Sequence, residues 1–382
     1  MRTFTFKGLF LTAVFMLLGC LSIQAADDDL ITRQITIKLD KAGTLPDKIG
    51  SSKKNLITKL KIVGEVNGTD WCFIREMAGS GYDGKSTEGK LSVLDLSEAK
   101  IVEGGDYYNK YYYYENDVYY YKNCYTSNDV IGKCAFKGCS GLTSLTLPDG
   151  ITEIGDEAFE YCSGLTSLTL PDGITEIGSS AFFGCSGLTS LTLPANIKRI
   201  GESAFENCSG LTSLNLPAGI TTIGSSAFYG CSGLTSLTIP DGVTKIGKYA
   251  FSNCSYLTSL TIPSSVNSLG DYAFKNCSSL QSVHVSWSTP ISVGKAFNKA
   301  DVSKCTLYVP QGTEQDYFLA DVWGDFGNIV EYDPTGIDKV TTSTDAKELS
   351  RYSVNGQRLA TPTKGLNIVK YSDGSVKKVV VQ

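Results

Sequence analysis

The sequence predicts an α/β solenoid with 23-residue coils, in which a parallel β-sheet forms one face and short helical turns form the other. Two regular spacings indicate this fold. A cysteine recurs with this period from Cys139 to Cys277, and a phenylalanine does so from Phe136 to Phe274. Residues 131–291 therefore hold seven copies of one unit. A fixed period of this length is typical of a solenoid, whose coils bury their apolar sides only against their neighbours.

Residues 1–25 are predicted to be an export signal. Arg2 precedes an apolar run, residues 8–19, that is too short to span a bilayer. Two processing sites compete. The sequence Leu-Leu-Gly-Cys, which ends at Cys20, is similar to a lipidation motif in which Cys20 carries the lipid, whereas Ile-Gln-Ala, which ends at Ala25, fits ordinary signal-peptidase cleavage. Either route takes the protein out of the cytoplasm.

Residues 26–130 are expected to form an N-terminal α/β cap that carries a tyrosine-rich loop and covers the apolar end of the solenoid. A helix in this cap is expected to begin at Thr69 or Asp70, because both residue types are good N-caps. Three apolar residues follow at helical spacing: Trp71, Ile74 and Met77. They should share the buried face of that helix.

Residues 107–125 hold ten of the 21 tyrosines of the chain. Tyrosine provides a large, rigid contact area and is typical of binding loops. The other interpretation is a hairpin that turns at Asn116-Asp117 and packs alternate tyrosines on the first coil. The candidate aromatic loop comprises Tyr107, Tyr108, Tyr111, Tyr112, Tyr113, Tyr114, Tyr119, Tyr120 and Tyr121.

Each repeat is expected to contain one short strand and one helical turn. In one copy, residues 165–170 end in strict alternation of apolar and polar residues, which indicates a strand. Pro171 ends this strand because proline cannot donate to a β-ladder, and residues 158–162 are expected to make about one helical turn. Stacked coils then place their strands about 4.8 Å apart, in a parallel sheet roughly 30 Å long.

The repeat reads I-G-x-x-A-F-x-x-C-S-x-L-T-S-L-T-L-P-x-x-I-T-x. This pattern resembles the BspA-like leucine-rich repeats of bacterial surface proteins in all seven copies. Residues 35–104 are similar to the N-terminal cap of that family, and residues 293–332 to its closing repeat and cap. The resemblance implies a leucine-rich repeat fold and attachment to host matrix proteins or to other cells, but it names no ligand.

Three segments are expected after the repeats. Residues 292–333 form a closing repeat and cap, with a helix near residues 313–319. Residues 334–348 form a polar linker, and residues 349–382 form a small β-module that ends in a strand at residues 376–381. Within the closing cap, two aromatic side chains are expected to plug the core: Trp323 and Phe326.

The C-terminal β-module is predicted to turn at Asn355-Gly356 and Asp373-Gly374. Its N-G-Q-R and K-G-x-N-I-V sequences resemble the sorting domains of the type IX (Por) secretion system. The resemblance implies a surface-sorting signal, or else a relic of one.

Composition narrows the function. The 382-residue chain is 42% hydrophobic and 19% charged, with a net charge of −5, which argues against nucleic-acid binding. It has one histidine, His284, although histidine is the commonest acid–base residue and metal ligand near neutral pH. No nucleophile motif is present in the sequence. We therefore expect neither an enzyme nor a cofactor or metal site.

The twelve cysteines raise the question of disulfides in an exported chain. Equivalent cysteines in successive coils should lie about 4.8 Å apart with parallel side chains, whereas a disulfide needs side chains that converge. The seven cysteines of the repeats are therefore predicted to be small buried apolar residues. Apart from Cys20 in the predicted export signal, four cysteines lie elsewhere, and a disulfide among them remains open: Cys72, Cys124, Cys134 and Cys305.

Because the leucines of each strand face inward, its serines and threonines should face outward and form a polar wall with almost no charge. Such a wall suits a repetitive polar partner, although serine and threonine also serve simply as soluble strand residues. The candidate face comprises Ser144, Thr146, Ser167, Thr169, Ser190, Thr192, Ser213, Asn215, Ser236, Thr238, Ser259, Thr261, Ser282 and His284.

These observations predict a binding protein that is secreted or displayed on the bacterial cell surface, at the outer membrane. Its expected partner is an extracellular protein or a glycan, bound by the polar wall or by the tyrosine-rich loop. A membrane contact is expected only through a lipid anchor or surface sorting. The alternative is a structural scaffold that displays another binding element and holds no ligand on its repeats.

Overall fold

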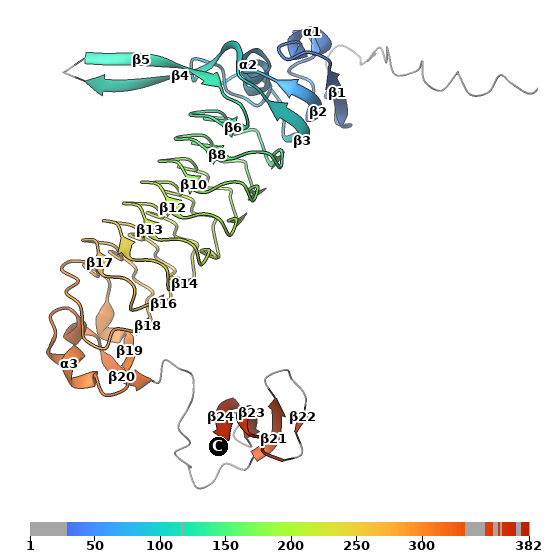
Figure 1. The fold of residues 1–382 in the computed structure, drawn as a ribbon. Coiled ribbons are helices and arrows are strands. Elements are labelled where there is room, and N and C mark those ends of the chain that lie inside the picture. Colours follow the sequence, from blue (N-terminus) through green and yellow to red (C-terminus); the bar gives the residue numbers. More distant parts are fainter. Residues whose placement is uncertain are drawn as a thin grey trace, which may run out of the picture.

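The computed structural model describes residues 29–115, 118–332, 348–353, 358–359, 361–371 and 376–381. The predicted signal peptide with Cys20 and Ala25, most of the linker, and the three predicted turns at 116–117, 355–356 and 373–374 lie outside the described residues. Within them, stacked coils form an elongated β-solenoid that runs from an N-terminal cap to a closing cap (Figure 1).

The N-terminal cap is built from three parallel strands and two helices. Their bounds are β1 Ile35–Leu39, α1 Leu45–Ile49, β2 Lys59–Val66, α2 Gly68–Met77 and β3 Val93–Ile101. The N-cap of α2 is Asn67, so the predicted start at Thr69 or Asp70 is wrong. The Asn67 side chain accepts a hydrogen bond from the Thr69 amide, and the Asp70 carboxylate accepts one from the Asn67 amide. This reciprocal capping box needs the more N-terminal residue as the cap.

Helix α2 closes the first coil by satisfying its backbone carbonyls. In later coils these positions accept an amide from the preceding coil, as Ala158 does from Phe136. The first coil has no predecessor, and side chains of the cap replace it: the Trp71 indole donates to the Ala135 carbonyl over 2.9 Å, and the buried Arg75 donates to that carbonyl over 3.0 Å and to the Lys137 carbonyl over 2.9 Å. A buried backbone carbonyl without a partner is costly, so these two residues let the repeats begin.

The coils pair in parallel, and each strand lies beside its equivalent in the next repeat, as Leu168 lies beside Leu191. The cap strands continue directly into the repeats, because β3 pairs with β7 and β7 with β9. This first sheet comprises β1, β2, β3, β7 (Ser144–Thr146), β9 (Ser167–Thr169) and β11 (Ser190–Thr192).

After this sheet, residues 211–217 form no strand. The repeat there carries Asn215 where its neighbours have threonine, and asparagine is depleted in strands. The expected single sheet is therefore divided in two.

The second part of that face continues into the closing cap. It comprises β14 (Ser236–Thr238), β16 (Ser259–Ile262), β18 (Ser282–Val285), β19 (Thr306–Pro310) and β20 (Asn328–Tyr332). Another sheet of two-residue strands follows the adjacent edge of the solenoid. Its members are β6 (Val130–Ile131), β8 (Glu153–Ile154), β10 (Glu176–Ile177), β12 (Arg199–Ile200), β13 (Thr222–Ile223), β15 (Lys245–Ile246) and β17 (Ser268–Leu269).

The expected helical turn of each repeat is a series of tight turns in the structure. Glu157 and Tyr161 have φ angles of 55° and 58°, which an α-helix excludes. The Phe159 amide donates to the Ala181 carbonyl of the next coil over 2.7 Å instead of bonding four residues back. Hydrogen bonds between coils thus consume the donors that a helix would need. These turns recur once in each coil between residues 131 and 299. We call the side of the solenoid that they form the turn edge.

The core of the repeats is a column of stacked phenylalanine rings. From Phe136 to Phe297, successive ring centroids lie 4.9–5.6 Å apart. Beside them the repeat cysteines are buried, as predicted, and each of six thiols donates to the carbonyl of a phenylalanine in the preceding coil, as Cys185 does to Phe159 over 3.1 Å. The structure records all cysteines of its described part as free thiols.

The closing cap buries its aromatic side chains as predicted. Helix α3 (Glu314–Leu319) begins after Thr313, and two 3-10 turns, Val302–Lys304 and Trp323–Asp325, flank it. Trp323 and Phe326 are buried, and the Trp323 indole donates to the Ile291 carbonyl over 2.8 Å.

The C-terminal module contains a separate antiparallel sheet. Its strands are β21 (Glu348–Ser353), β22 (Arg358–Leu359), β23 (Gly365–Tyr371) and β24 (Val376–Val381), in the order β22-β21-β23-β24. The final strand covers the residues that the sequence predicts for it.

Candidate binding surfaces

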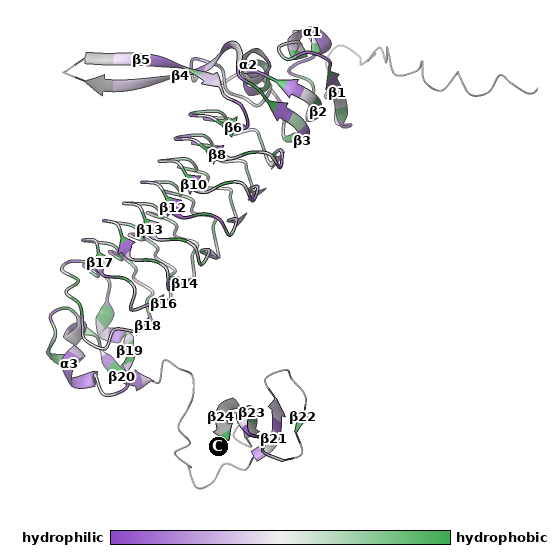
Figure 2. Cartoon of the chain, in the orientation of Figure 1, coloured by the Kyte–Doolittle hydropathy of each residue, from purple (hydrophilic) through white to green (hydrophobic). Residues whose placement is uncertain are grey.

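The tyrosine-rich segment forms a two-stranded hairpin that pairs with no other sheet in the described ranges. Strand β4 (Gly104–Glu115) runs antiparallel to β5 (Val118–Thr126), with Asn109 opposite Cys124 and Glu115 opposite Val118. Figure 1 shows this hairpin projecting from the N-terminal end of the solenoid. In Figure 2 its described part is white to purple, whereas green, hydrophobic positions recur through the coils. The antiparallel strands of the hairpin interpretation are therefore confirmed, whereas its predicted turn lies outside the described residues.

The base of the hairpin is fixed to the first coil. Tyr108 is buried, and its hydroxyl donates to the Lys133 carbonyl over 2.9 Å. Burial raises the pKa of Tyr108, so its phenol stays protonated. The Asn109 amide donates to the Cys134 carbonyl over 3.1 Å, and the Lys133 ammonium lies 4.1 Å from the centroid of the Tyr111 ring. Like the side chains of α2, Tyr108 occupies a carbonyl to which a preceding coil would donate, since the equivalent Asp156 carbonyl accepts the Cys134 amide over 3.0 Å.

Further along the hairpin, several tyrosines are open to solvent. Tyr112, Tyr120 and Tyr121 expose 67%, 43% and 62% of their surface. The Lys110 ammonium lies 5.2–5.4 Å from the ring centroids of three tyrosines: Tyr82, Tyr107 and Tyr121. The side chains of Tyr114 and Tyr119 lie outside the described ones. The hairpin thus presents aromatic rings interleaved with cations, so packing at its base and exposure beyond it both occur.

The polar wall lies where the sequence places it. Its ten residues from Ser144 to Thr238 are exposed, whereas the four from Ser259 to His284 are half-buried. A shallow hollow of about 310 Å³ lies over β7 and β9. The missing strand at 213–215 interrupts the wall near its middle.

The wall ends at an aromatic shelf that sequence reasoning missed. The His284 ring stacks on Tyr308 with centroids 4.2 Å apart and meets the edge of Tyr332 at 5.7 Å. Burial lowers the pKa of His284, so the ring is neutral near pH 7. His284 of β18 pairs with Tyr308 of β19. The sequence separation of these two residues is one residue longer than the 23-residue period of the repeats. This change of step hides the alignment in the sequence.

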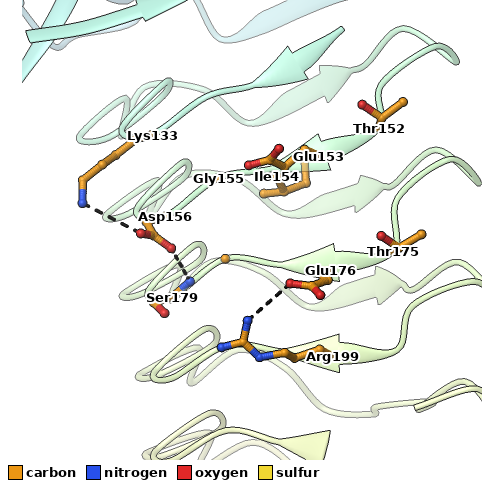
Figure 3. Close-up of a pocket in the computed structure, with 11 residues that line it drawn as sticks. Lys133, Thr152, Glu153, Ile154, Gly155, Asp156, Thr175, Glu176, Ser179 and Arg199 are labelled. Carbon is orange, nitrogen blue, oxygen red and sulfur yellow. Dashed lines mark hydrogen bonds and ion pairs between the residues drawn. The ribbon is translucent and has the colours of Figure 1, made fainter. Parts of the chain in front are cut away.

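A third surface is a polar groove of about 400 Å³ over β8, β10 and β12 (Figure 3). Glu153 and Glu176 line it, and the Arg199 guanidinium lies 3.3 Å from the Glu176 carboxylate. At the rim, Lys133 and Asp156 lie 3.9 Å apart. Among the residues that the structure describes, no three histidine, cysteine, aspartate or glutamate side chains gather in a way that could hold a metal ion.

Next to this groove, carboxylates of the second coil neutralise two lysines of the first coil. The Lys133 ammonium lies 3.3 Å from Glu157, and Lys137 lies 2.5 Å from both Glu157 and Glu160. Burial by itself would raise the pKa of the Glu157 carboxyl, but its hydrogen bond and attraction to Lys137, with further attraction to Lys133, lower that pKa to about 2. Glu157 is therefore ionised throughout the physiological range.

Comparison with protein families identifies the repeats. The model of the BspA type leucine rich repeat region matches in six copies at residues 109–235 and 198–314, which together exceed half of the chain. No curated protein matches the chain. No helix within the described ranges is long and apolar enough to cross a bilayer.

Three solved structures are similar to this chain. A leucine rich repeat protein of T. pallidum is 33% identical over 40% of this chain and 71% of its own, with a TM-score of 0.37. A leucine rich cell surface protein of Faecalibacterium prausnitzii is 22% identical over 78% and 87%, with a TM-score of 0.36. The pneumococcal vaccine antigen PcpA is 18% identical over 73% and 69%, with a TM-score of 0.41.

Proposed function

This chain belongs to the BspA-type leucine rich repeat family, and from that premise we propose that it is an adhesive binding protein of the bacterial exterior. The export signal predicted in residues 1–25 supports a location outside the cytoplasm. The proposed partner is an extracellular protein or a glycan. Contact through a rigid solenoid suits adhesion, because the repeats form a long surface that needs little ordering on binding.

The hairpin of β4 and β5 is the proposed principal contact element. The observation that carries this is the exposure of Tyr112, Tyr120 and Tyr121 beyond an anchored base. Exposed tyrosines of limited rotational freedom bury large area at low entropic cost. Lysines beside the rings add attraction for aromatic or anionic groups.

The repeats serve in this proposal mainly as a rigid support. One observation favours the scaffold role: the polar wall offers small hydroxyl side chains over a shallow hollow of about 310 Å³ and contains no charged residue. Large aromatic and arginine side chains usually supply the binding energy of an interface, whereas serine and threonine supply little. The wall therefore remains a secondary contact surface.

The proposal is tested by measuring the binding of the exported protein to arrayed glycans and to purified extracellular matrix proteins. A triple variant changes Tyr112, Tyr120 and Tyr121 to serine, and a matched variant charges the wall through Thr192→Glu and Thr238→Glu. We expect a saturable hit that the tyrosine variant loses by about tenfold or more, equivalent to about 1.4 kcal/mol, and that the wall variant keeps. Loss only in the wall variant would assign binding to the sheet face, and no saturable hit for the parent would contradict adhesion.

We also propose that residues 349–382 direct surface sorting, in keeping with the sequence resemblance of this module. Deleting the module should move the protein from the cell-surface fraction to another fraction in the producing bacterium. An unchanged distribution would exclude a working signal. Labelling with a radioactive fatty acid, compared with Cys20→Ser, separates lipid anchoring from sorting.

A further inference from the structure

The turn edge of the last coils carries a second cluster of tyrosines and lysines, far along the chain from the hairpin. The Tyr249 and Tyr272 rings stack with centroids 5.0 Å apart and planes within 11°. Lys248 lies 5.1 Å from the Tyr249 centroid, and Lys275 lies 5.3 Å from that of Tyr272. Lys295 reaches the Tyr272 ring at 6.0 Å. We call these five residues the lysine–tyrosine row.

In the first coils a carboxylate neutralises the lysines of the turn edge, whereas the lysine–tyrosine row has tyrosines at the equivalent position. Tyr249 and Tyr272 occupy the position of Glu157 in later copies of the repeat. Where Glu157 neutralises two lysines, the tyrosines contribute no charge. Among the residues that the structure describes, no carboxylate lies within 4.0 Å of the ammonium groups of this row. The carboxylate of Asp271, which precedes Tyr272 in the sequence, accepts the Lys295 backbone amide over 3.3 Å.

Backbone geometry makes the two tyrosines unusual. Tyr249 and Tyr272 have φ angles of 59° and 62°, and Ser203 and Ser226 occupy the same conformation in the preceding coils. A bulky side chain is uncommon in this left-handed region. The fold accepts serine here, so it does not require an aromatic ring.

From these observations we propose that the lysine–tyrosine row is a binding site for a polyanionic polysaccharide that lies along the solenoid axis. The lysines belong to three successive coils, which stack about 4.8 Å apart. A linear chain with regularly spaced sulfate or carboxylate groups matches such a row of uncompensated ammonium groups. The stacked rings hold the lysines by cation–π contact and reduce the entropy lost on binding. This site is separate from the hairpin and goes beyond the proposed function.

The test uses immobilised heparin and the whole exported protein at physiological ionic strength. One variant combines Lys248→Gln, Lys275→Gln and Lys295→Gln. Its control removes the same charge from three exposed, unstacked lysines of the cap: Lys38, Lys59 and Lys100. We expect saturable binding that weakens with salt and that the row variant, but not the control, reduces by about tenfold or more.

A second variant separates the rings from the charges. Tyr249→Ser and Tyr272→Ser restore the residue of the preceding coils, so the fold should survive, and binding should weaken about threefold or more through loss of the ordered lysines. Equal effects of the row and control variants would overturn the proposal, as would absence of heparin binding. Equal competition by single-stranded DNA would also overturn it. The hairpin serine variant should keep heparin binding, which distinguishes this site from the proposed adhesive one.

Discussion

Replacing Phe205 by alanine tests the central physical claim about the repeats, that each coil is held by its two neighbours. Phe205 is fully buried, and its ring lies 5.1 Å from both Phe182 and Phe228. A buried phenylalanine-to-alanine change costs about 3–5 kcal/mol, depending on how far the site can collapse. The coils cannot close on the gap, because inter-coil bonds such as Phe205 amide to Ala227 carbonyl, at 2.7 Å, fix their spacing. We therefore expect a loss of about 4–5 kcal/mol.

The loss should also change how the protein unfolds. In a solenoid the stability is a sum over coils and their interfaces, so a weak central interface lets the two ends melt separately. Urea unfolding followed by far-UV circular dichroism should show a lower midpoint and a broader or split transition. Tryptophans report each end, with Trp71 in the first cap and Trp323 in the closing cap.

The control is Phe318→Ala, because Phe318 exposes 62% of its surface on α3. This change should cost no more than about 0.5 kcal/mol. A loss below about 1 kcal/mol for Phe205→Ala, or equal losses for the two variants, would refute the view that the phenylalanine column carries the stability of the repeats.

Three further predictions concern the cap, the thiols and acid stability. Arg75→Met should lower the free energy of unfolding by about 3 kcal/mol or more, since buried hydrogen bonds from a charged group are lost. The control Arg199→Met, at an exposed ion pair, should change it by less than about 1 kcal/mol. Equal effects of the two variants in chemical denaturation would contradict the capping role of Arg75. Cys277 is fully buried and its burial raises its pKa to about 12, whereas Cys72 is only half-buried, although burial raises its pKa as well. A thiol reagent at mildly alkaline pH should therefore label Cys72 in the native protein and Cys277 only after unfolding. Peptide mapping that finds both labelled together would be inconsistent with the buried column. The lysine partners of Glu157 lower its pKa from 4.5 to about 2. The stabilisation by ionised Glu157 is therefore complete above the unfolded pKa and disappears as the pH falls from about 4.5 to about 2. Over this range the urea midpoint should fall less for Glu157→Gln than for the parent protein, and parallel curves for the two proteins would rule out this contribution.

The sequence by itself determined the solenoid, its period and its core. The regular step between copies specifies which residues become neighbours, because each coil packs on a copy of itself. The burial of Phe205 and Cys208 follows from that rule, as does the outward position of Thr192. The sequence also suggested the hairpin, as one of two interpretations of the tyrosine-rich segment, since strand patterns are a local property of the sequence.

Tertiary structure decided the features that depend on contacts between segments distant in sequence. In the sequence Arg75 is an ordinary helix residue. Its role depends on the fold, which places it beside carbonyls of the first coil that need a hydrogen-bond donor. The tight turns replace the expected helical turns because amides such as that of Phe159 bond to the next coil. The stacking of His284 on Tyr308 depends on a changed step in the closing repeat. The lysine–tyrosine row likewise appears only when three coils are placed side by side. The local sequence pattern specifies which conformation a residue prefers, whereas the stacking of the backbone decides which residues become its partners.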